Sequence, residues 1–286
     1  MHHLNIFINL TRLNKPIGYL LLFWPCSWGL AYAYSYNQNL ELFISYLLLF
    51  FGGSVLMRSA GCIVNDIVDK DFDIRVKRTK SRPLASGKIT IRKSLLYVAI
   101  LCFIAFLILI QFNRLTIILG MSSMILAFTY PYMKRVTYWP QLFLGLTFNW
   151  GIIMAWTSVN GSISIEILIL YFSAIFWTLG YDTIYGTQDM SDDEIIGLKS
   201  TSIKFKKNIK MFIGFCYFCT FFGLAFLFKQ EIGVNMFTLL FIFFIFSLGY
   251  QVVNLKISAP KNSLKLFKLN NYSGLILFLS LILRGI

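Results

Sequence analysis

Two acidic stretches concentrate the side chains in this chain that could do chemistry. The first runs from residue 65 to 73 and the second from 182 to 194, and together they hold nine of the 12 Asp and Glu residues. Carboxylate and amide oxygens are the ligands that hard cations such as Mg²⁺ prefer, and phosphate oxygens of a substrate usually complete a Mg²⁺ site. The clustering therefore predicts a metal site for a phosphorylated substrate.

In the first stretch, oxygen-bearing side chains recur about once per helical turn. Asn65, Asp69 and Asp73 are spaced i, i+4 and i+8, and Asp66 lies seven residues before Asp73. Residues three or four apart share one face of a helix, so a continuous helix would stack these ligands. The alternative is a helix end whose acids are simply solvated.

The second stretch repeats this spacing. Asp182, Tyr185, Asp189 and Asp193 are spaced i, i+3, i+7 and i+11. Two acidic faces opposite each other could hold a diphosphate through bridging metal ions. The presence of two such stretches favours a shared site over two solvated helix ends.

Basic side chains accompany both acidic stretches. Arg78 and Arg82 follow the first, Lys199 follows the second, and Lys134 and Arg135 form a third group between them. Next to a metal-bound diphosphate, they would neutralise the charge of the leaving group. The alternative is that they only mark one side of a membrane.

Arg58 is a charged residue inside an apolar run, two helical turns before Asn65. A charge in the middle of a membrane helix costs roughly 2.5 to 3.5 kcal/mol and normally faces a partner inside the helix bundle. That partner would be a substrate carboxylate or an Asp, unless the side chain extends to the membrane surface instead.

The elements that must position these residues are membrane helices. Of the 286 residues, 57% are hydrophobic, which is typical of a protein that crosses the membrane many times. We expect an all-α membrane protein with one domain over residues 1–286. The expected spans are residues 17–36, 40–62, 94–112, 115–131, 141–159, 162–181, 209–228, 235–253 and 270–286.

The distribution of basic residues predicts the topology. Of the 26 Lys and Arg residues, 22 lie before the first span or in the loops at 63–93, 132–140, 182–210 and 254–269. The positive-inside rule then places the N-terminus and both acidic stretches in the cytoplasm and the C-terminus in the periplasm. The net charge of +14 is thus a topology signal and does not indicate a nucleic-acid partner. Because no cleavable signal or Arg- and Ser-rich transit segment is apparent, we expect a bacterial inner membrane.

Taken together, these motifs resemble the UbiA superfamily of intramembrane aromatic prenyltransferases, and most of all its 4-hydroxybenzoate polyprenyltransferase branch. The first family motif, N-D-x-x-D-x-x-x-D, matches residues 65–73, and the second, D-x-x-Y-x-x-x-D, matches residues 182–189. The stretch R-L-x-K-P-I-G at residues 12–18 and the stretch Y-P-x-M-K-R-x-T-Y at residues 130–138 extend the match.

The resemblance implies nine transmembrane helices around a central cavity that binds Mg²⁺ and an isoprenyl diphosphate. It also implies transfer of a polyprenyl group to 4-hydroxybenzoate, at the carbon ortho to the hydroxyl, in ubiquinone biosynthesis. We expect the acceptor carboxylate to bind Arg58 or, as second choice, Arg135, because a buried carboxylate must be paired.

The expected roles can be grouped by chemistry. Catalysis is assigned to Asp69, Asp73, Asp182, Asp189, Arg58 and Arg135, substrate binding to Arg78, Arg82, Lys134, Tyr185 and Lys199, and Mg²⁺ binding to Asn65, Asp66, Asp69, Asp73, Asp182, Asp189 and Asp193.

Two alternative functions remain open. A prenyltransferase of the same superfamily could use another acceptor, such as a haem, a naphthoate or a homogentisate. A transporter could use the acids as a pathway, but transport favours ionisable groups near the bilayer midplane, and these acids are at one interface. Histidine chemistry is excluded, because the only histidines are His2 and His3 at the terminus.

Overall fold

The structure, a computed structural model, describes residues 2–76 and 79–284, and all regular elements within them are helices. The fold class expected from the sequence, all-α, is confirmed. The helices are α1 (His2–Thr11), α2 (Ile17–Asn37), α3 (Leu40–Val68), α4 (Lys70–Asp73), α5 (Ile91–Leu109), α6 (Arg114–Val136), α7 (Pro140–Asn160), α8 (Ile165–Gly186), α9 (Met190–Ile195), α10 (Thr201–Lys204), α11 (Ile209–Leu227), α12 (Met236–Asn254) and α13 (Pro260–Leu283).

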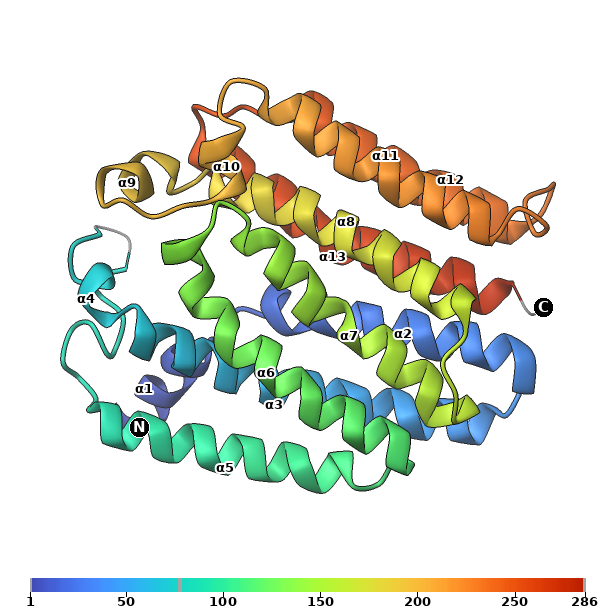
Figure 1. Cartoon of the computed structure of the whole chain (residues 1–286), viewed down its shortest axis with the longest axis horizontal. Coiled ribbons are helices and arrows are strands. Elements are labelled where there is room, and N and C mark those ends of the chain that lie inside the picture. The colour runs from blue at the N-terminus through green and yellow to red at the C-terminus, as the bar shows by residue number, and fades with distance from the viewer. Residues whose placement is uncertain (1, 77–78, 285–286) are drawn as a thin grey trace.

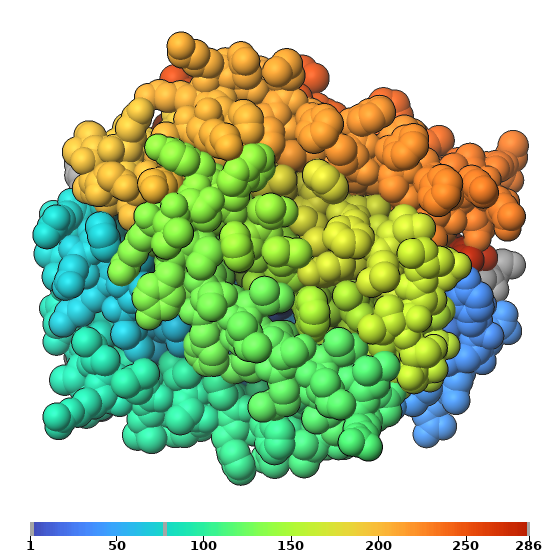
Figure 2. Space-filling view, in the orientation of Figure 1, coloured from blue at the N-terminus to red at the C-terminus, as the bar shows by residue number. Residues whose placement is uncertain are grey.

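Each of the nine expected spans coincides with a long helix in the described part of the chain. Eight of these helices are long and apolar enough to cross a membrane. The other one, α2, has 21 residues, but its sequence includes Trp24, Pro25 and Trp28. Most of the second half of α2 is buried, and α3, α7 and α13 pack against it. In the view of Figure 2, the dark blue part of the chain reaches the surface mainly at one edge. Because α2 meets protein more than lipid, its composition can be less apolar.

The helices α3 and α13 extend furthest beyond the expected spans. The helix α3 continues to Val68, past the expected end at residue 62, so Asn65 and Asp66 are part of the helix. The helix α13 begins at Pro260, ten residues earlier than expected. Proline fits the first turn of a helix, where its missing N–H leaves no hydrogen bond unmade, and this explains the earlier start.

Polar side chains begin several of the long helices. Thr90, Asn113, Ser164 and Asn235 each accept a hydrogen bond from a backbone N–H in the first turn of α5, α6, α8 and α12. Asn39 does the same for α3. These bonds pair N–H groups that the start of a helix leaves without an intrahelical partner. The positions of these helix starts are therefore encoded locally.

The long helices run side by side along the longest axis of the molecule (Figure 1). The helix α2 packs against α3, α7 and α13, while α8 packs against α7 and α11. The N-terminus and the short helices α1, α4, α9 and α10 lie at one end, and the C-terminus lies at the other (Figure 1). Both acidic stretches follow helices that end on the same side, so the fold brings them to one end of the bundle.

Candidate functional site

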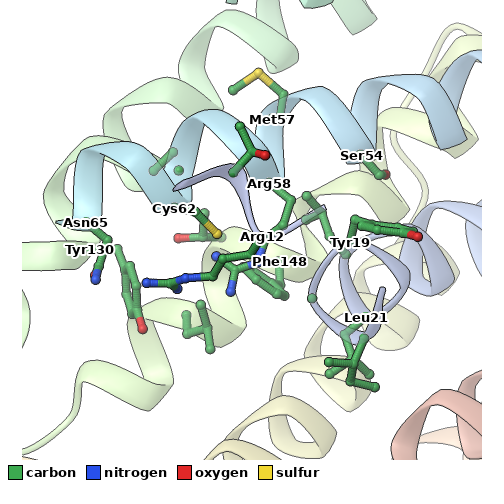
Figure 3. Close-up of a pocket in the computed structure, with 18 of the residues that line it drawn as sticks. Arg12, Tyr19, Leu21, Ser54, Met57, Arg58, Cys62, Asn65, Tyr130 and Phe148 are labelled. Carbon is green, nitrogen blue, oxygen red and sulfur yellow. The ribbon is translucent and has the colours of Figure 1, made fainter. Parts of the chain in front are cut away.

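A cavity of about 1710 Å³ lies between the helices and reaches the end of the bundle that carries the acidic stretches. Residues of α2, α3, α5, α6, α7, α8 and α13 line it. Figure 3 shows part of its wall, with Asn65 beside Tyr130 and the side chains of Arg12, Arg58 and Phe148 nearby. One cavity therefore joins charged groups and apolar walls.

The first acidic stretch is not one continuous helix. The helix α3 ends at Val68, Asp69 follows with φ −90° and ψ 1°, and α4 then covers only residues 70–73. Asn65 and Asp69 nevertheless stay in contact, because the Asn65 amide donates to Asp69 Oδ2 at 2.9 Å. The expectation of a continuous helix was wrong here, but the neighbour relation that it predicted between Asn65 and Asp69 is kept.

Every carboxylate that we assigned to the metal in this stretch has a basic partner. Asp66 Oδ1 accepts from Arg12 at 2.5 Å and from Arg82 at 3.1 Å. Arg82 also donates to Asp73 at 2.7 Å. The three carboxylates Asp66, Asp69 and Asp73 are buried. Because a buried carboxylate needs compensation, these ion pairs keep the stretch close to neutral.

Asp69 contacts two basic residues of α6. Lys134 Nζ donates to Asp69 Oδ2, and an Arg135 nitrogen lies 3.6 Å from Asp69 Oδ1. That distance is too long for a hydrogen bond, and Asp69 Oδ1 is buried without a hydrogen-bond partner. The end of α6 is thus held against the end of α3, and one buried Asp69 oxygen makes no hydrogen bond.

Burial also affects the protonation of Asp73. Loss of hydration raises the pKa of the Asp73 carboxyl above its ordinary value, although the Arg82 guanidinium opposes this change. The ion pair with Arg82 therefore favours the charged form of this carboxyl.

The second acidic stretch is also divided between two helices. Asp182 and Tyr185 belong to α8, which ends at Gly186, whereas Asp189 immediately precedes α9 and Asp193 lies within it. The expectation of one continuous helical face was wrong, because the chain turns after Gly186. All four side chains line the cavity.

The oxygen donors of both stretches fit a hard cation. Their ligand atoms are carboxylate and amide oxygens, which suit Mg²⁺, and Asp69 Oδ1 is a buried acceptor without a donor. Among residues 2–76 and 79–284, however, no three acid, His or Cys side chains already form a compact metal cluster. The basic partners described above hold the acids of the first stretch instead.

Arg58 projects from α3 into the cavity. Its Nε is buried without a hydrogen-bond partner, and its guanidinium carbon lies 5.5 Å from the centre of the Phe148 ring. A Cβ on Gly18 would come within 2.9 Å of Nε, so glycine at that position makes room for the side chain. Arg58 thus has a buried donor without a hydrogen-bond partner next to the cavity.

The other predicted basic residues occupy different positions. Lys134, Lys199 and Arg82 line the cavity. Arg135 is exposed instead, donates to the Val68 carbonyl at 2.5 Å and lies over the rings of Phe72 and Tyr132, outside the cavity lining. Arg78 lies outside the described residues.

Three residues of the cavity were not assigned a role from the sequence. Arg12 pairs with Asp66, and its φ of 57° is unusual for a residue other than glycine. Tyr130 lines the cavity near Asn65, and the Tyr181 hydroxyl is buried there without a partner. Arg12 and Tyr130 begin the two flanking stretches of the resemblance, so those motifs held a signal for them, whereas no spacing rule singles out Tyr181.

Comparison with known proteins identifies the relatives of this chain. A model of the UbiA prenyltransferase family matches residues 22–281. The protein named "4-hydroxybenzoate polyprenyltransferase, mitochondrial" of Bos taurus is 40% identical over 287 residues, covering 98% of this chain and 75% of that protein. The protein of the same name from Arabidopsis thaliana is 40% identical, and the match covers 97% of this chain and 68% of that protein. The one from Homo sapiens is 39% identical, and the match covers 98% of this chain and 75% of that protein.

Solved structures share the fold. The apo structure of a UbiA homolog from Aeropyrum pernix superimposes with a TM-score of 0.76 at 23% identity, covering 93% of this chain and 98% of that one. The structure of a UbiA homolog from Archaeoglobus fulgidus bound to GPP and Mg²⁺ superimposes with a TM-score of 0.68 at 15% identity. The match covers 97% of this chain and 99% of that one. At these identities the likeness concerns the fold.

The expected bacterial inner membrane is contradicted by the relatives. The three similar proteins are mitochondrial by name and come from Bos taurus, Arabidopsis thaliana and Homo sapiens, which are all eukaryotes. Our expectation used the apparent lack of a transit segment, but the match covers only 68% to 75% of these longer proteins, so nothing about targeting follows from where this chain begins. The assignment of cytoplasmic and periplasmic sides is withdrawn with it, while the membrane character of the helices stands.

Proposed function

Because this chain belongs to the UbiA prenyltransferase family, we propose that it transfers a polyprenyl group from polyprenyl diphosphate to 4-hydroxybenzoate. The products would be 3-polyprenyl-4-hydroxybenzoate and diphosphate, made for ubiquinone biosynthesis, with residues 1–286 acting as one membrane domain. The observation that carries the proposal is a single cavity lined by Asn65 of the first acidic stretch, by acids of the second, by basic side chains and by apolar helix faces. The carboxylates of Asp66, Asp69 and Asp73 are buried and are not part of this lining. The names of the curated relatives support the choice of acceptor.

The diphosphate would bind at the acidic end of the cavity with Mg²⁺. Bound there, Mg²⁺ would neutralise and polarise the diphosphate oxygens. The Archaeoglobus fulgidus structure bound to GPP and Mg²⁺ supports this, because that protein has the same fold. The residues that would hold Mg²⁺ are Asn65, Asp66, Asp69, Asp73, Asp182, Asp189 and Asp193.

Basic side chains would stabilise the leaving group. Arg82, Lys134 and Lys199 line the cavity next to the acids, and we include Arg78 from the same loop as Arg82. When the bond between C1 of the prenyl group and the diphosphate oxygen breaks, its electron pair stays on the diphosphate. Cationic donors placed where that charge develops lower the barrier for this step.

The remaining allylic cation needs protection from water until the acceptor ring attacks. Apolar and aromatic side chains surround the cavity next to the acids, including Tyr130, Phe148, Tyr181 and Tyr185. The faces of aromatic rings attract cations, and a dry cavity prevents hydrolysis. The ring carbon ortho to the acceptor hydroxyl forms the new bond to C1, and loss of the proton from that carbon restores aromaticity.

Arg58 would hold the acceptor carboxylate. Its Nε is a buried donor without a partner, and a carboxylate that enters a low-dielectric cavity must be paired. A planar guanidinium can bind both carboxylate oxygens at once, which would orient the ring as well as bind it. Arg135, the second choice from the sequence, has its guanidinium outside the cavity lining, and this favours Arg58.

A reconstitution assay tests the proposed function. The purified protein in lipid nanodiscs would be given Mg²⁺, geranyl diphosphate and 4-hydroxybenzoate, and the product would be identified by mass spectrometry. We expect a prenylated hydroxybenzoate that forms with Mg²⁺ and disappears with EDTA.

Parallel reactions would replace the acceptor with a dihydroxynaphthoate, a homogentisate or a haem. Preferential transfer to one of these compounds would show that it, and not 4-hydroxybenzoate, is the acceptor. The reaction class, prenyl transfer, would be unchanged. Absence of transfer to any acceptor, from a folded protein that binds the diphosphate, would refute the proposal as a whole.

A further inference from the structure

Arg12 lies between the cavity and one of the acids that we assign to Mg²⁺. Its guanidinium donates to Asp66 Oδ1 at 2.5 Å, and Arg82 donates to the same oxygen at 3.1 Å. Both arginines line the cavity, whereas Asp66 is 1% exposed and is not part of the lining. A metal ion that comes from the cavity therefore meets these arginines before it meets the carboxylate.

The two arginines differ in what they would lose if a metal ion took Asp66. Arg82 also donates to Asp73 Oδ2 at 2.7 Å, so it keeps an acid partner. Within the described part of the chain, Asp66 is the one acid that forms an ion pair with Arg12. A guanidinium and a metal ion at one carboxylate oxygen repel each other. Arg12 is therefore the group that must leave Asp66 when a metal ion binds there.

The backbone of Arg12 also indicates that this contact matters. Its φ of 57° is left-handed, which is unfavourable for a residue with a Cβ. The Lys15 N–H donates to the Arg12 carbonyl at 2.9 Å and closes the turn between α1 and α2. Residues in rare backbone conformations occur mostly at functional sites, where surrounding contacts maintain them. The turn thus directs Arg12 toward Asp66 despite its unfavourable conformation.

We propose that Arg12 competes with the metal ion for Asp66 and is the counter-ion of this acid in the metal-free protein. The inference rests on the proposed function, which includes Asp66 among the Mg²⁺ ligands. Without metal, Arg12 supplies positive charge that a buried carboxylate requires. With metal and diphosphate bound, Arg12 releases Asp66 and donates to a diphosphate oxygen in the cavity. Diphosphate therefore changes Arg12 from a competitor of the metal into a group that stabilises the complex.

Binding of Mn²⁺ tests this competition without any turnover. The Mn²⁺ affinity of the parent protein and of Arg12→Gln would be measured in nanodiscs by electron paramagnetic resonance, first alone and then with saturating inorganic diphosphate. Without diphosphate, we expect Arg12→Gln to bind Mn²⁺ about tenfold more tightly, because a neighbouring arginine changes the proton affinity of a carboxylate by at least that factor. With diphosphate, we expect the variant to bind Mn²⁺ more weakly than the parent, because glutamine cannot make the charged contact.

Arg75→Gln is the matched control. Arg75 is exposed, follows α4 at the same end of the bundle and forms no ion pair within the described residues, so this variant removes the same charge without the contact. We expect it to bind Mn²⁺ as the parent does. Arg12→Lys keeps the charge but loses the planar contact, and it should give a smaller gain without diphosphate. Thermal unfolding in EDTA would confirm that each variant is folded, and Arg12→Lys decides the comparison if Arg12→Gln is not.

An unchanged or lower Mn²⁺ affinity of Arg12→Gln without diphosphate would overturn the inference, because Arg12 would then only support the structure. An equal gain in Arg75→Gln would also overturn it, since the effect would be general electrostatics. So would a gain that persists with diphosphate, because Arg12 would then oppose the metal in both states. If the parent protein binds no Mn²⁺ even with diphosphate, the metal-dependent proposed function itself fails. Normal Mn²⁺ binding and turnover of the parent beside any of the first three results would refute the inference alone.

Discussion

At the scale of single residues, the site is a set of charges in a membrane protein that compensate one another. Asp66 pairs with Arg12 and Arg82, and Asp69 with Lys134, so the acids are held without exposure to water. Arg58 differs, because its Nε has no hydrogen-bond partner. A buried donor without an acceptor is costly, which is why we assign it to a substrate.

Replacing Arg58 by lysine tests the acceptor site. Lysine keeps the charge but cannot form the planar two-point contact with a carboxylate. We expect Arg58→Lys to raise the KM for 4-hydroxybenzoate by about tenfold, with little change in the KM for the diphosphate. Arg114→Lys, at an exposed position on α6, is the control. A rise in the KM for the diphosphate alone would move Arg58 to the leaving-group site.

Replacing Asp69 by asparagine tests the metal site. The change removes a charge at nearly the same volume, so we expect weaker Mn²⁺ binding, measured by electron paramagnetic resonance, and a fall in kcat of about 100-fold or more. Asp71→Asn is the matched control, because Asp71 lies in the neighbouring short helix α4 and is exposed. If both variants bind Mn²⁺ as the parent does, Asp69 is not a ligand.

At the scale of helices, buried polar groups fix how α8 packs. The indole of Trp177 on α8 donates to Asn270 of α13 at 2.9 Å, and Asn270 donates to Gln251 of α12 at 2.8 Å. Tyr217 of α11 donates to the same Gln251 oxygen at 2.8 Å. Asp182 of α8 lines the cavity. The network that fixes the position of α8 therefore also fixes the position of this part of the cavity wall.

Removing the centre of this network should weaken helix packing. Asn270→Ala leaves the Trp177 N–H and the Gln251 side-chain N–H without their acceptor, while the Gln251 oxygen keeps its bond from Tyr217. Each unpaired buried group costs about 1 to 3 kcal/mol. We expect a lower Tm in detergent and a lower kcat with KM values close to the parent. The control is Asn254→Ala, since the Asn254 side chain bonds only to its own helix. An unchanged Tm for Asn270→Ala would show that the network contributes no stability.

At the scale of the whole molecule, two groups of elements carry the acidic stretches beside one cavity: α3 with α4, and α8 with α9. The first stretch begins in the last turn of α3 and the second near the end of α8, and both lie at the same end of the bundle (Figure 1). A ligand that binds both stretches would connect these groups. Binding to the folded state alone stabilises a protein by mass action.

Thermal unfolding in the presence of ligands tests this connection. We expect Mg²⁺ together with inorganic diphosphate to stabilise the protein by about 2.7 kcal/mol at roughly 100 times Kd, and either one alone to give a smaller rise in Tm. EDTA should reverse the effect. The same Tm with Mg²⁺ alone as with both ligands would mean that the diphosphate does not bind through the metal.

Local features of the chain were readable from the sequence. Apolar runs predicted the nine long helices, because membrane spans need a length that only such runs supply. The two acidic stretches and their spacing predicted oxygen ligands at one end of the bundle, and all four predicted side chains of the second stretch line the cavity. The positions of the helices were confirmed because they depend on neighbours in the sequence, whereas the metal-binding roles of the acids stay predictions.

Only the tertiary structure decided which distant residues meet. Arg12 reaches Asp66 across 54 positions and Lys134 reaches Asp69 across 65, whereas Arg135, the next residue after Lys134, lies outside the cavity. Gly29 and Gly53 look equivalent in the sequence, but one permits helix contact and the other opens a cavity. The reason is physical: spacing determines which face of a helix a residue occupies, but the packing of whole helices determines what that face meets.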